Sequence, residues 1–192
     1  MKRDEIKEAA VKYFLQKGYE GASLSEIAEE AGIKKASIYS HFKGKDDLFL
    51  EILREGKAEE IKQKSNFFDE VDASNPEAFL YAYLLHAKEM FQSNALLKFW
   101  LRVGFFPPVH LYDTIQEEVI EAESFQEKQI ADLSKQWLQN GLVTSKNEQT
   151  FSLAFTGIIM AVMVEIVYFN DRKRVEDKLE ALWYVFWQGV RS

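Results

Sequence analysis

The sequence predicts an all-α protein, and three observations support this fold class. Apolar residues recur at helical spacing along almost the whole chain, and no stretch shows the sustained alternation of a β-strand. Three prolines and nine glycines in 192 residues leave little room for long irregular segments. With 47% hydrophobic and 29% charged residues, the chain has enough apolar material to fold around a buried core.

The first two helices are expected over residues 2–17 and 24–31. Ser23 and Glu26 have the spacing of a capping box, in which each residue satisfies a backbone N–H of the other, so they mark the start of the second helix. Gly32 ends that helix, because glycine adopts the positive φ of a tight turn without steric cost.

A third, short helix is expected over residues 35–41, and a fourth begins near Asp46 and Asp47, whose carboxylates favour a helix N-terminus. Beyond residue 65 the expected helices lengthen. They cover residues 76–93, 94–104, 110–139, 146–170 and 172–191. This organisation predicts a three-helix module over residues 1–47, followed by an antiparallel helical bundle over residues 48–192.

Two short helices joined by a glycine turn have the sequence form of a helix-turn-helix. Ala28 is small where the two helices must approach closely. The apolar residues expected to form the core of this module are Phe14, Leu24, Ile27, Ile33, Ile38 and Phe42. The outer face and its edges are then left to Lys34, Lys35, Ser37, Tyr39, Ser40 and His41. A helix presented in this way can enter the major groove of DNA.

The net charge of −7 argues against a nucleic-acid partner until its distribution is considered. Residues 1–50 hold nine Lys or Arg and nine Asp or Glu, and residues 33–45 hold four lysines and no acid. Lys34 and Lys35 stand at the N-terminus of the third helix, where the helix dipole disfavours each cation by roughly 0.3–1 kcal/mol. Residues that local folding energetics disfavour, as these two lysines are, are typical of a functional surface. The alternative is an ordinary solvated face.

Residues 5–50 resemble the DNA-binding signature of the TetR family. The resemblance lies in GYEGASLSEIAEEAGI, which starts at Gly18, and SIYSHFKGKDDL, which starts at Ser37. It implies that Tyr39 and Lys45 contact phosphates. It also implies that residues around them and near the start of the second helix touch DNA, and that the third helix reads bases. The DNA-binding residues expected in this way are Ser23, Ser25, Lys34, Lys35, Ala36, Ser37, Tyr39, Ser40, His41 and Lys45.

Three positions depart from the pattern that many members of this family share. Ala36 stands where many have glycine, Lys34 where many have a serine or threonine cap, and Ala22 where threonine is common. The methyl group of Ala36 faces the groove and is suited to contact a thymine methyl. The operator of a relative therefore cannot be transferred to this chain.

The resemblance also implies an inducer pocket inside the C-terminal bundle, but that region shares no motif. Composition alone gives the candidate lining residues, which are mostly aromatic and surround the break at residues 107–108. They are Phe79, Tyr83, His86, Met90, Phe99, Trp100, Phe105, Phe106, His110 and Tyr112. Pockets for small molecules are mostly apolar with a few polar groups, so this set predicts an aromatic or lipophilic inducer. The alternative for each residue is ordinary core packing.

The last two helices are suited to dimerisation. Their apolar residues at helical spacing include Leu179, Leu182, Trp183, Phe186, Trp187 and Val190, and their small residues include Ala154, Gly157 and Ala161. The alternative is packing within one chain. The resemblance favours a homodimer through a four-helix bundle of these helices, which a palindromic operator also requires.

The most apolar run, residues 151–169, is interpreted as a buried helix and not as a membrane span, because it contains Ser152, Thr156 and Glu165. An isolated carboxylate in such a helix must be paired, hydrogen-bonded or neutral. Glu165 therefore contacts either a cationic inducer, a dimer partner or a solvent edge.

Other function classes receive little support from the sequence. There is no phosphate-binding loop, dinucleotide-binding loop or nucleophile triad, so the chain is not expected to be an enzyme or to need a cofactor. His86 and Glu89, even with His110, are too few for a metal site. Cysteine is absent and the N-terminus has no signal peptide, as expected for a cytoplasmic protein. The expected function is a repressor that an inducer releases from operator DNA; the alternative is an architectural DNA-binding protein without a ligand.

Overall fold

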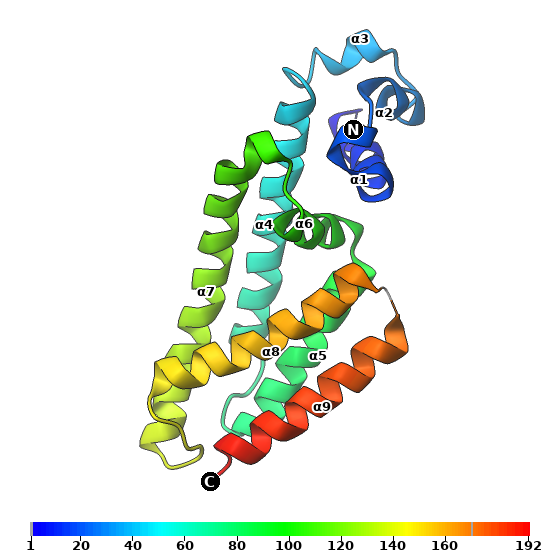
Figure 1. Cartoon of the computed structure of the whole chain (residues 1–192). Helices are drawn as coiled ribbons and strands as arrows, with labels where there is room; N and C mark the ends of the chain where they lie inside the picture. The colour runs from blue at the N-terminus through cyan, green and yellow to red at the C-terminus, as the bar shows by residue number, and fades with distance from the viewer. Residues whose placement is uncertain (1, 170) are drawn as a thin grey trace. The chain divides into compact units, whose positions relative to one another are not determined.

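The computed structural model describes residues 2–169 and 171–192, and it confirms the all-α fold class for this part of the chain (Figure 1). The helices are α1 (Lys2–Gly21), α2 (Leu24–Glu30), α3 (Lys35–Ile38), α4 (Lys45–Glu70), α5 (Pro76–Ser93), α6 (Ala95–Phe105), η1 (Val109–Leu111), α7 (Tyr112–Gln139), α8 (Glu148–Tyr168) and α9 (Arg172–Val190). A single residue pair, Val143 and Arg191, forms an isolated antiparallel bridge within the described ranges.

The chain divides into two compact units. Unit 1 contains Met1–Glu60 and Ser93–Val119, and unit 2 contains Ile61–Gln92 and Ile120–Ser192. Helices α4 and α7 each begin in unit 1 and end in unit 2. The boundary expected after residue 47 follows the extent of the DNA-binding motif and stays a prediction.

Three phenylalanines from α1, α4 and α6 form the centre of unit 1. The ring centroid of Phe14 lies 4.9 Å from that of Phe49 and 5.9 Å from that of Phe99, and Phe49 and Phe99 are 5.2 Å apart. All three side chains are at most 2% exposed. The pairs Phe14–Phe49 and Phe49–Phe99 pack edge to face, which adds to the stabilisation that burial provides. The three helices are thereby fixed to one another.

Helices α4 and α6 approach closely at Gly56. A Cβ atom at this position would lie 2.7 Å from Cβ of Trp100, a distance that real Cβ atoms essentially never show. The indole Nε1 of Trp100, in turn, donates a hydrogen bond to the buried carboxylate of Glu60. The missing side chain at Gly56 therefore allows Trp100 to lie against α4 and to reach Glu60.

Aromatic side chains also fill unit 2. Phe79 of α5 lies 5.4 Å from Phe67 and 5.8 Å from Trp137, measured between ring centroids. The indole Nε1 of Trp137 donates a hydrogen bond to the carbonyl oxygen of Ala73 at 2.8 Å, which satisfies a buried polar group. Helices α8 and α9 run side by side in opposite directions and complete the unit (Figure 1).

Helix α8 is long and apolar enough to cross a membrane by length and composition, but half of its most apolar window is buried inside the protein. The carboxylate of Glu165, near the C-terminal end of α8, is 3% exposed and binds Nζ of Lys178 at 2.8 Å and the guanidinium of Arg174. These cations, Arg174 first, hold the pKa of Glu165 below its ordinary value. Glu165 is therefore paired with two cations of its own chain, a role that the sequence analysis did not include, and its contact with an inducer or a dimer partner stays a prediction.

Several helix boundaries predicted from the sequence differ from those of the structure. The first helix was expected to end at residue 17, but α1 resumes beyond Gly18, whose φ of 70° and ψ of 179° interrupt it, and continues to Gly21. The helix expected to begin at His110 is preceded by the 3-10 turn η1 and starts at Tyr112. The C-terminal limit predicted for the helix over 146–170 lies outside the described residues.

The third predicted helix was also too long, since α3 ends at Ile38 and not at His41. The backbone N–H groups of Ser40 and His41 donate to the carbonyl oxygens of Ser37 and Ile38, three residues earlier. The hydroxyl of Ser40 donates to the carbonyl oxygen of Ser37 as well, at 2.7 Å. Serine hydroxyls compete in this way for helical carbonyls, so the chain tightens into a turn.

Candidate DNA-binding interface

The turn between α2 and α3 has the geometry that its sequence predicts. The hydroxyl of Ser23 accepts a hydrogen bond from the N–H of Glu26, and the carboxylate of Glu26 accepts one from the N–H of Ser23. At the other end of α2, Gly32 has a φ of 66°. The N–H of Ile33 donates to the carbonyl oxygen of Ala28 at 2.9 Å, and that of Gly32 to Glu29 at 3.0 Å, which is a Schellman motif.

Helix α3 turns its polar residues to solvent. Ile38 is fully buried, whereas Lys34, Lys35, Ala36 and Ser37 are exposed. Lys34 occupies the N-cap position, and no side chain there accepts a hydrogen bond from the first turn of the helix. Cations at an uncapped helix N-terminus gain nothing from the fold, which supports a role for them with an anionic partner.

The remaining predicted DNA contacts surround α3. Tyr39 is 54% exposed directly after the helix, and the exposed Ser40 and half-buried His41 follow it. Ser23 and Ser25, at the start of α2, are also exposed. The structure thus leaves these side chains accessible from solvent, and their contacts with DNA stay predictions.

Lys45 is held in place by an aromatic ring. Its Nζ lies 4.2 Å from the ring centroid of Tyr19, and the hydroxyl of Tyr19 donates a hydrogen bond to the carboxylate of Asp46. Burial and this hydrogen bond raise the pKa of Tyr19, and the same hydrogen bond lowers the pKa of Asp46. Nε2 of His110 lies 3.4 Å from the same carboxylate. The start of α4 is therefore tied to α1 and to η1.

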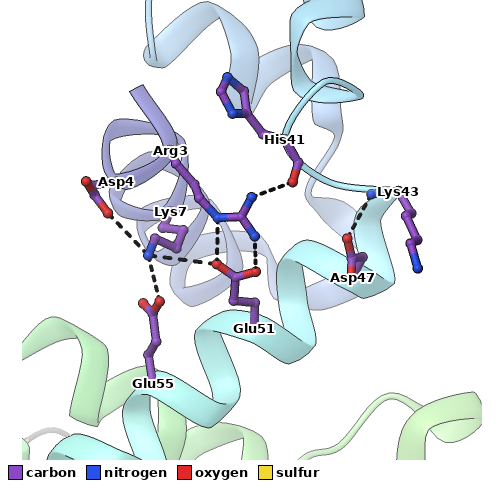
Figure 2. A network of polar contacts seen from close by, with 8 residues as sticks. All are labelled: Arg3, Asp4, Lys7, His41, Lys43, Asp47, Glu51 and Glu55. Atoms are coloured by element: carbon purple, nitrogen blue, oxygen red, sulfur yellow. Dashed lines mark hydrogen bonds and ion pairs between the residues drawn. The ribbon is translucent and has the colours of Figure 1, made fainter. Parts of the chain in front are cut away.

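A second polar network connects α1, the end of the turn after α3, and α4, as Figure 2 shows. The guanidinium of Arg3 binds both carboxylate oxygens of Glu51, with Nε 2.9 Å from Oε1. Nη1 of Arg3 also donates to the carbonyl oxygen of His41 at 2.6 Å, while the imidazole of His41 points away from the network (Figure 2). Arg3 lies 4.3 Å from the ring centroid of Phe42.

Further contacts reinforce this network. Nζ of Lys7 lies 2.6 Å from Glu55, 3.3 Å from Asp4 and 3.9 Å from Glu51. The N–H of Lys43 donates to the carboxylate of Asp47 at 2.8 Å. Together these contacts position the backbone that follows α3 against α4.

Sequence reasoning missed this network. Arg3 and Glu51 are 48 residues apart, so no local spacing connects them. Both residues look like ordinary surface charges in the sequence, and only the packing of α1 against α4 makes them partners.

The candidate ligand residues lie in both units. In unit 2, Phe67 brings three of them together, since its ring centroid is 5.4 Å from Phe79, 5.2 Å from Tyr83 and 5.0 Å from His86. The hydroxyl of Tyr83 donates to the buried amide oxygen of Gln126 at 3.1 Å. Met90, on the same helix, is 4% exposed.

The other candidate ligand residues belong to unit 1. Phe99 is part of its phenylalanine core, and Trp100 is held by Glu60. Phe105 is half-buried; Phe106 and Tyr112 are 51% and 52% exposed. As described above, His110 lies beside Tyr19 and Asp46. No three His, Asp or Glu side chains in the described parts of the chain gather as metal ligands.

Helices α8 and α9 each expose apolar side chains. On α8, Leu153, Met160 and Tyr168 are 52%, 41% and 57% exposed, and their spacing puts them on one side of the helix. Tyr184 and Val185 of α9 are 66% and 70% exposed. We call these five residues the α8–α9 face. Two residues expected at a dimer interface, by contrast, pack within unit 2: Leu179 and Trp183, which are 1% and 9% exposed.

Comparison with known proteins agrees with the geometry of the N-terminal helices. Residues 6–52 match the family described as bacterial regulatory proteins, tetR family. The chain is 24% identical over 191 residues to YvkB of Bacillus subtilis, an uncharacterized HTH-type transcriptional regulator, across 97% of this chain and 96% of YvkB.

Two solved structures share the fold over nearly the whole chain. FadR of Bacillus subtilis, solved in complex with stearoyl-CoA, has a TM-score of 0.73 at 16% identity, covering 96% of this chain and 97% of FadR. AibR, solved with isovaleryl coenzyme A and operator DNA, has a TM-score of 0.71 at 20% identity, with the same coverage of both chains. Residues 6–52, from α1 to the first part of α4, therefore carry the DNA-binding domain of the TetR family, and the chain is a helix-turn-helix transcriptional regulator of this type.

Proposed function

We propose that this regulator is a cytoplasmic repressor that binds a palindromic operator as a homodimer and leaves it when a small aromatic or lipophilic inducer binds. The observation that carries the proposal is the exposed cationic face of α3, set on a well-formed Schellman turn. Within the part of the chain that the structure describes, Lys34 makes no capping hydrogen bond, and lysines exposed in this way suit the phosphates and base edges of the major groove.

Tyr39 and Lys45 are the proposed phosphate anchors. Tyr39 is exposed and therefore accessible to a phosphate. Lys45 is held against the ring of Tyr19, so it does not need to be ordered at full entropic cost when DNA binds. Base reading is assigned to Lys35, Ala36 and Ser37 of α3 and to Ser40 in the turn that follows it. Lys34, His41, Ser23 and Ser25 complete the contacts with the DNA backbone.

The α8–α9 face is the proposed dimer interface. Exposed apolar side chains on two adjacent helices are typical of a surface that a protein partner covers. A second copy of the chain places two reading helices on the two halves of a palindrome, as closed twofold symmetry requires.

For the inducer site, we propose the aromatic residues that Phe67 gathers in unit 2, namely Phe79, Tyr83 and His86. FadR and AibR were each solved with an acyl coenzyme A, and AibR with operator DNA in addition. These neighbours support a ligand-responsive repressor. Helix α4, which begins at the DNA-binding module in unit 1 and ends in unit 2, is the proposed route of coupling.

The DNA contacts are tested by the salt dependence of binding, measured by fluorescence anisotropy on a bound duplex. Lys45→Ala removes one phosphate contact, so the slope of log affinity against log salt concentration falls by about 0.9. Tyr39→Phe weakens binding to all duplexes alike. Lys128→Ala, an exposed lysine of α7, serves as the control for net charge. Unchanged affinity in both Tyr39→Phe and Lys45→Ala would contradict the assignment.

Induction is tested by reciprocity. If an inducer binds the DNA-incompatible state about 100-fold more tightly, the coupling free energy is about 2.7 kcal/mol. Operator DNA must then weaken inducer binding by the same factor. A compound that releases DNA but binds equally well with and without the operator would exclude this mechanism.

A further inference from the structure

The imidazole of His86 has one nitrogen that lacks a hydrogen-bond partner among the described residues. Nε2 is buried and receives no bond from any side chain or backbone group. The other nitrogen is satisfied by the backbone of Gln63. Buried polar atoms are nearly always paired in folded proteins, because an unmade hydrogen bond leaves the cost of desolvation uncompensated. We therefore expect a bound molecule that is not part of the isolated chain to form a hydrogen bond with Nε2.

The protonation state of His86 decides what that partner is. Burial lowers the pKa of His86, the nearby ammonium of Lys64 lowers it further, and the imidazole is neutral at pH 7. The bond to the backbone of Gln63 favours the charged form, so the carbonyl oxygen accepts and Nδ1 carries the proton. In this tautomer Nε2 is a hydrogen-bond acceptor. Its missing partner must be a donor.

The surroundings of His86 describe the rest of the ligand. Its ring lies 5.0 Å from Phe67 at an interplanar angle of 30°, and Phe67 also contacts Tyr83. The hydroxyl of Tyr83 already donates to Gln126, so it does not supply the missing donor. Aromatic rings favour a flat apolar body. The cation of Lys64, which is 5% exposed, disfavours a positively charged ligand and favours an acidic hydroxyl.

We propose that Nε2 of His86 accepts a hydrogen bond from the hydroxyl of an uncharged aromatic alcohol, so that the inducer of this regulator belongs to the phenol class. The inference rests on the proposed function, because it assigns the chemistry of the inducer site. It adds a specificity determinant: His86 selects ligands that carry a donor, while Phe67 and its neighbours select the aromatic body.

A matched pair of ligands tests this assignment by calorimetry on the full-length protein. The two compounds are 2-naphthol, which has a hydroxyl donor, and 2-methoxynaphthalene, in which a methyl group replaces the hydroxyl proton. Wild type should bind 2-naphthol about tenfold more tightly, as expected for one buried hydrogen bond. In His86→Phe, which keeps an aromatic ring beside Phe67 but removes the acceptor, the preference should disappear. Tyr81→Phe removes a hydroxyl that donates to Glu180, on the same helix but outside the cluster, and should keep the preference.

A second measurement does not depend on any variant. In ¹⁵N spectra of wild-type protein, 2-naphthol should shift the resonance of Nε2 of His86, and 2-methoxynaphthalene should leave it in place. The proposal is overturned if wild type binds neither compound, binds both equally because water occupies Nε2, or keeps its preference in His86→Phe.

The proposed function can fail separately. A compound without a donor that releases DNA equally well from wild type and His86→Phe would overturn the role of His86 and leave the repressor intact. Binding of 2-naphthol that depends on His86 but never releases DNA would support the site and contradict induction through it.

Discussion

The exposed face of α3 and the α8–α9 face differ in the chemistry that they present to solvent. The first carries two lysines and small polar residues on a tightly hydrogen-bonded turn, while the second carries leucine, methionine, tyrosine and valine side chains. A cationic polar face can stay hydrated until DNA displaces its ions. An apolar face is stabilised only when another surface covers it. The two faces therefore call for different partners, and each can be disrupted without touching the other.

The largest effect is expected from a charge on the α8–α9 face. Val185→Glu puts a carboxylate on a side chain that is 70% exposed in the isolated chain but buried in the proposed dimer. Loss of apolar burial on both copies, together with desolvation of the charge, should raise the dimer dissociation constant by at least about 100-fold. Sedimentation equilibrium measures this constant.

Ile120→Glu is the matched control for this prediction. Ile120 is also exposed, at 59%, but lies on α7 and outside the α8–α9 face. This variant should stay dimeric. A dimeric Val185→Glu, or a monomeric Ile120→Glu, would refute the placement of the interface.

A smaller effect is expected in the core of unit 1. Gly56→Ala forces a Cβ atom to within 2.7 Å of Trp100, so α4 and α6 must separate. Overpacking of this kind costs about 1–3 kcal/mol of unfolding free energy. Gly104→Ala, where the new Cβ meets Val119 at an ordinary 3.5 Å, should cost less or stabilise the helix. Urea unfolding compares the two, and equal stability of both variants would show that the approach at Gly56 is not tight.

The smallest effect concerns the carboxylate inside the apolar helix α8. The cations Arg174 and Lys178 keep the pKa of Glu165 below the ordinary value of 4.5 that it has in the unfolded chain. The stabilisation is therefore complete above pH 4.5 and is lost as the pH falls through the lower, folded pKa. In Glu165→Gln, part of this acid sensitivity should vanish from the unfolding free energy. Glu117→Gln, at an exposed carboxylate, should behave like wild type; identical pH profiles for all three proteins would argue against the pairing.

The two regions also differed in how far the sequence could predict them. The capping box at Ser23 and the glycine turn at Gly32 depend on residues a few positions apart, so both were readable and both are present. The end of α3 could not be predicted in the same way. The hydroxyl of Ser40 competes for the carbonyl oxygen of Ser37, and helix propensity alone does not say whether the helix or the turn is more stable there. The bond between Arg3 and Glu51 is set by tertiary packing alone.

In the bundle, composition identified aromatic residues but not their partners. Phe99 and Phe79 look alike in the sequence, yet one packs with Phe14 and Phe49 in unit 1 and the other with Phe67 in unit 2. Likewise, nothing in the sequence distinguishes His86, which has an unsatisfied nitrogen, from His110, which lies beside a carboxylate. Helical periodicity predicts which face of a helix is buried, but it does not predict which residues of other helices pack against that face.

The central claim, that two copies of the chain read a symmetric DNA site through α3, is tested most directly by selecting bound duplexes from a random pool and sequencing them. The account predicts an inverted repeat whose half-sites are about 10 base pairs apart, or a multiple of that, centre to centre. It also predicts that Lys35→Ala changes the preferred bases within each half-site without changing the spacing. Recovery of no enriched sequence, or of a single asymmetric site that Lys35→Ala leaves unaltered, would contradict it.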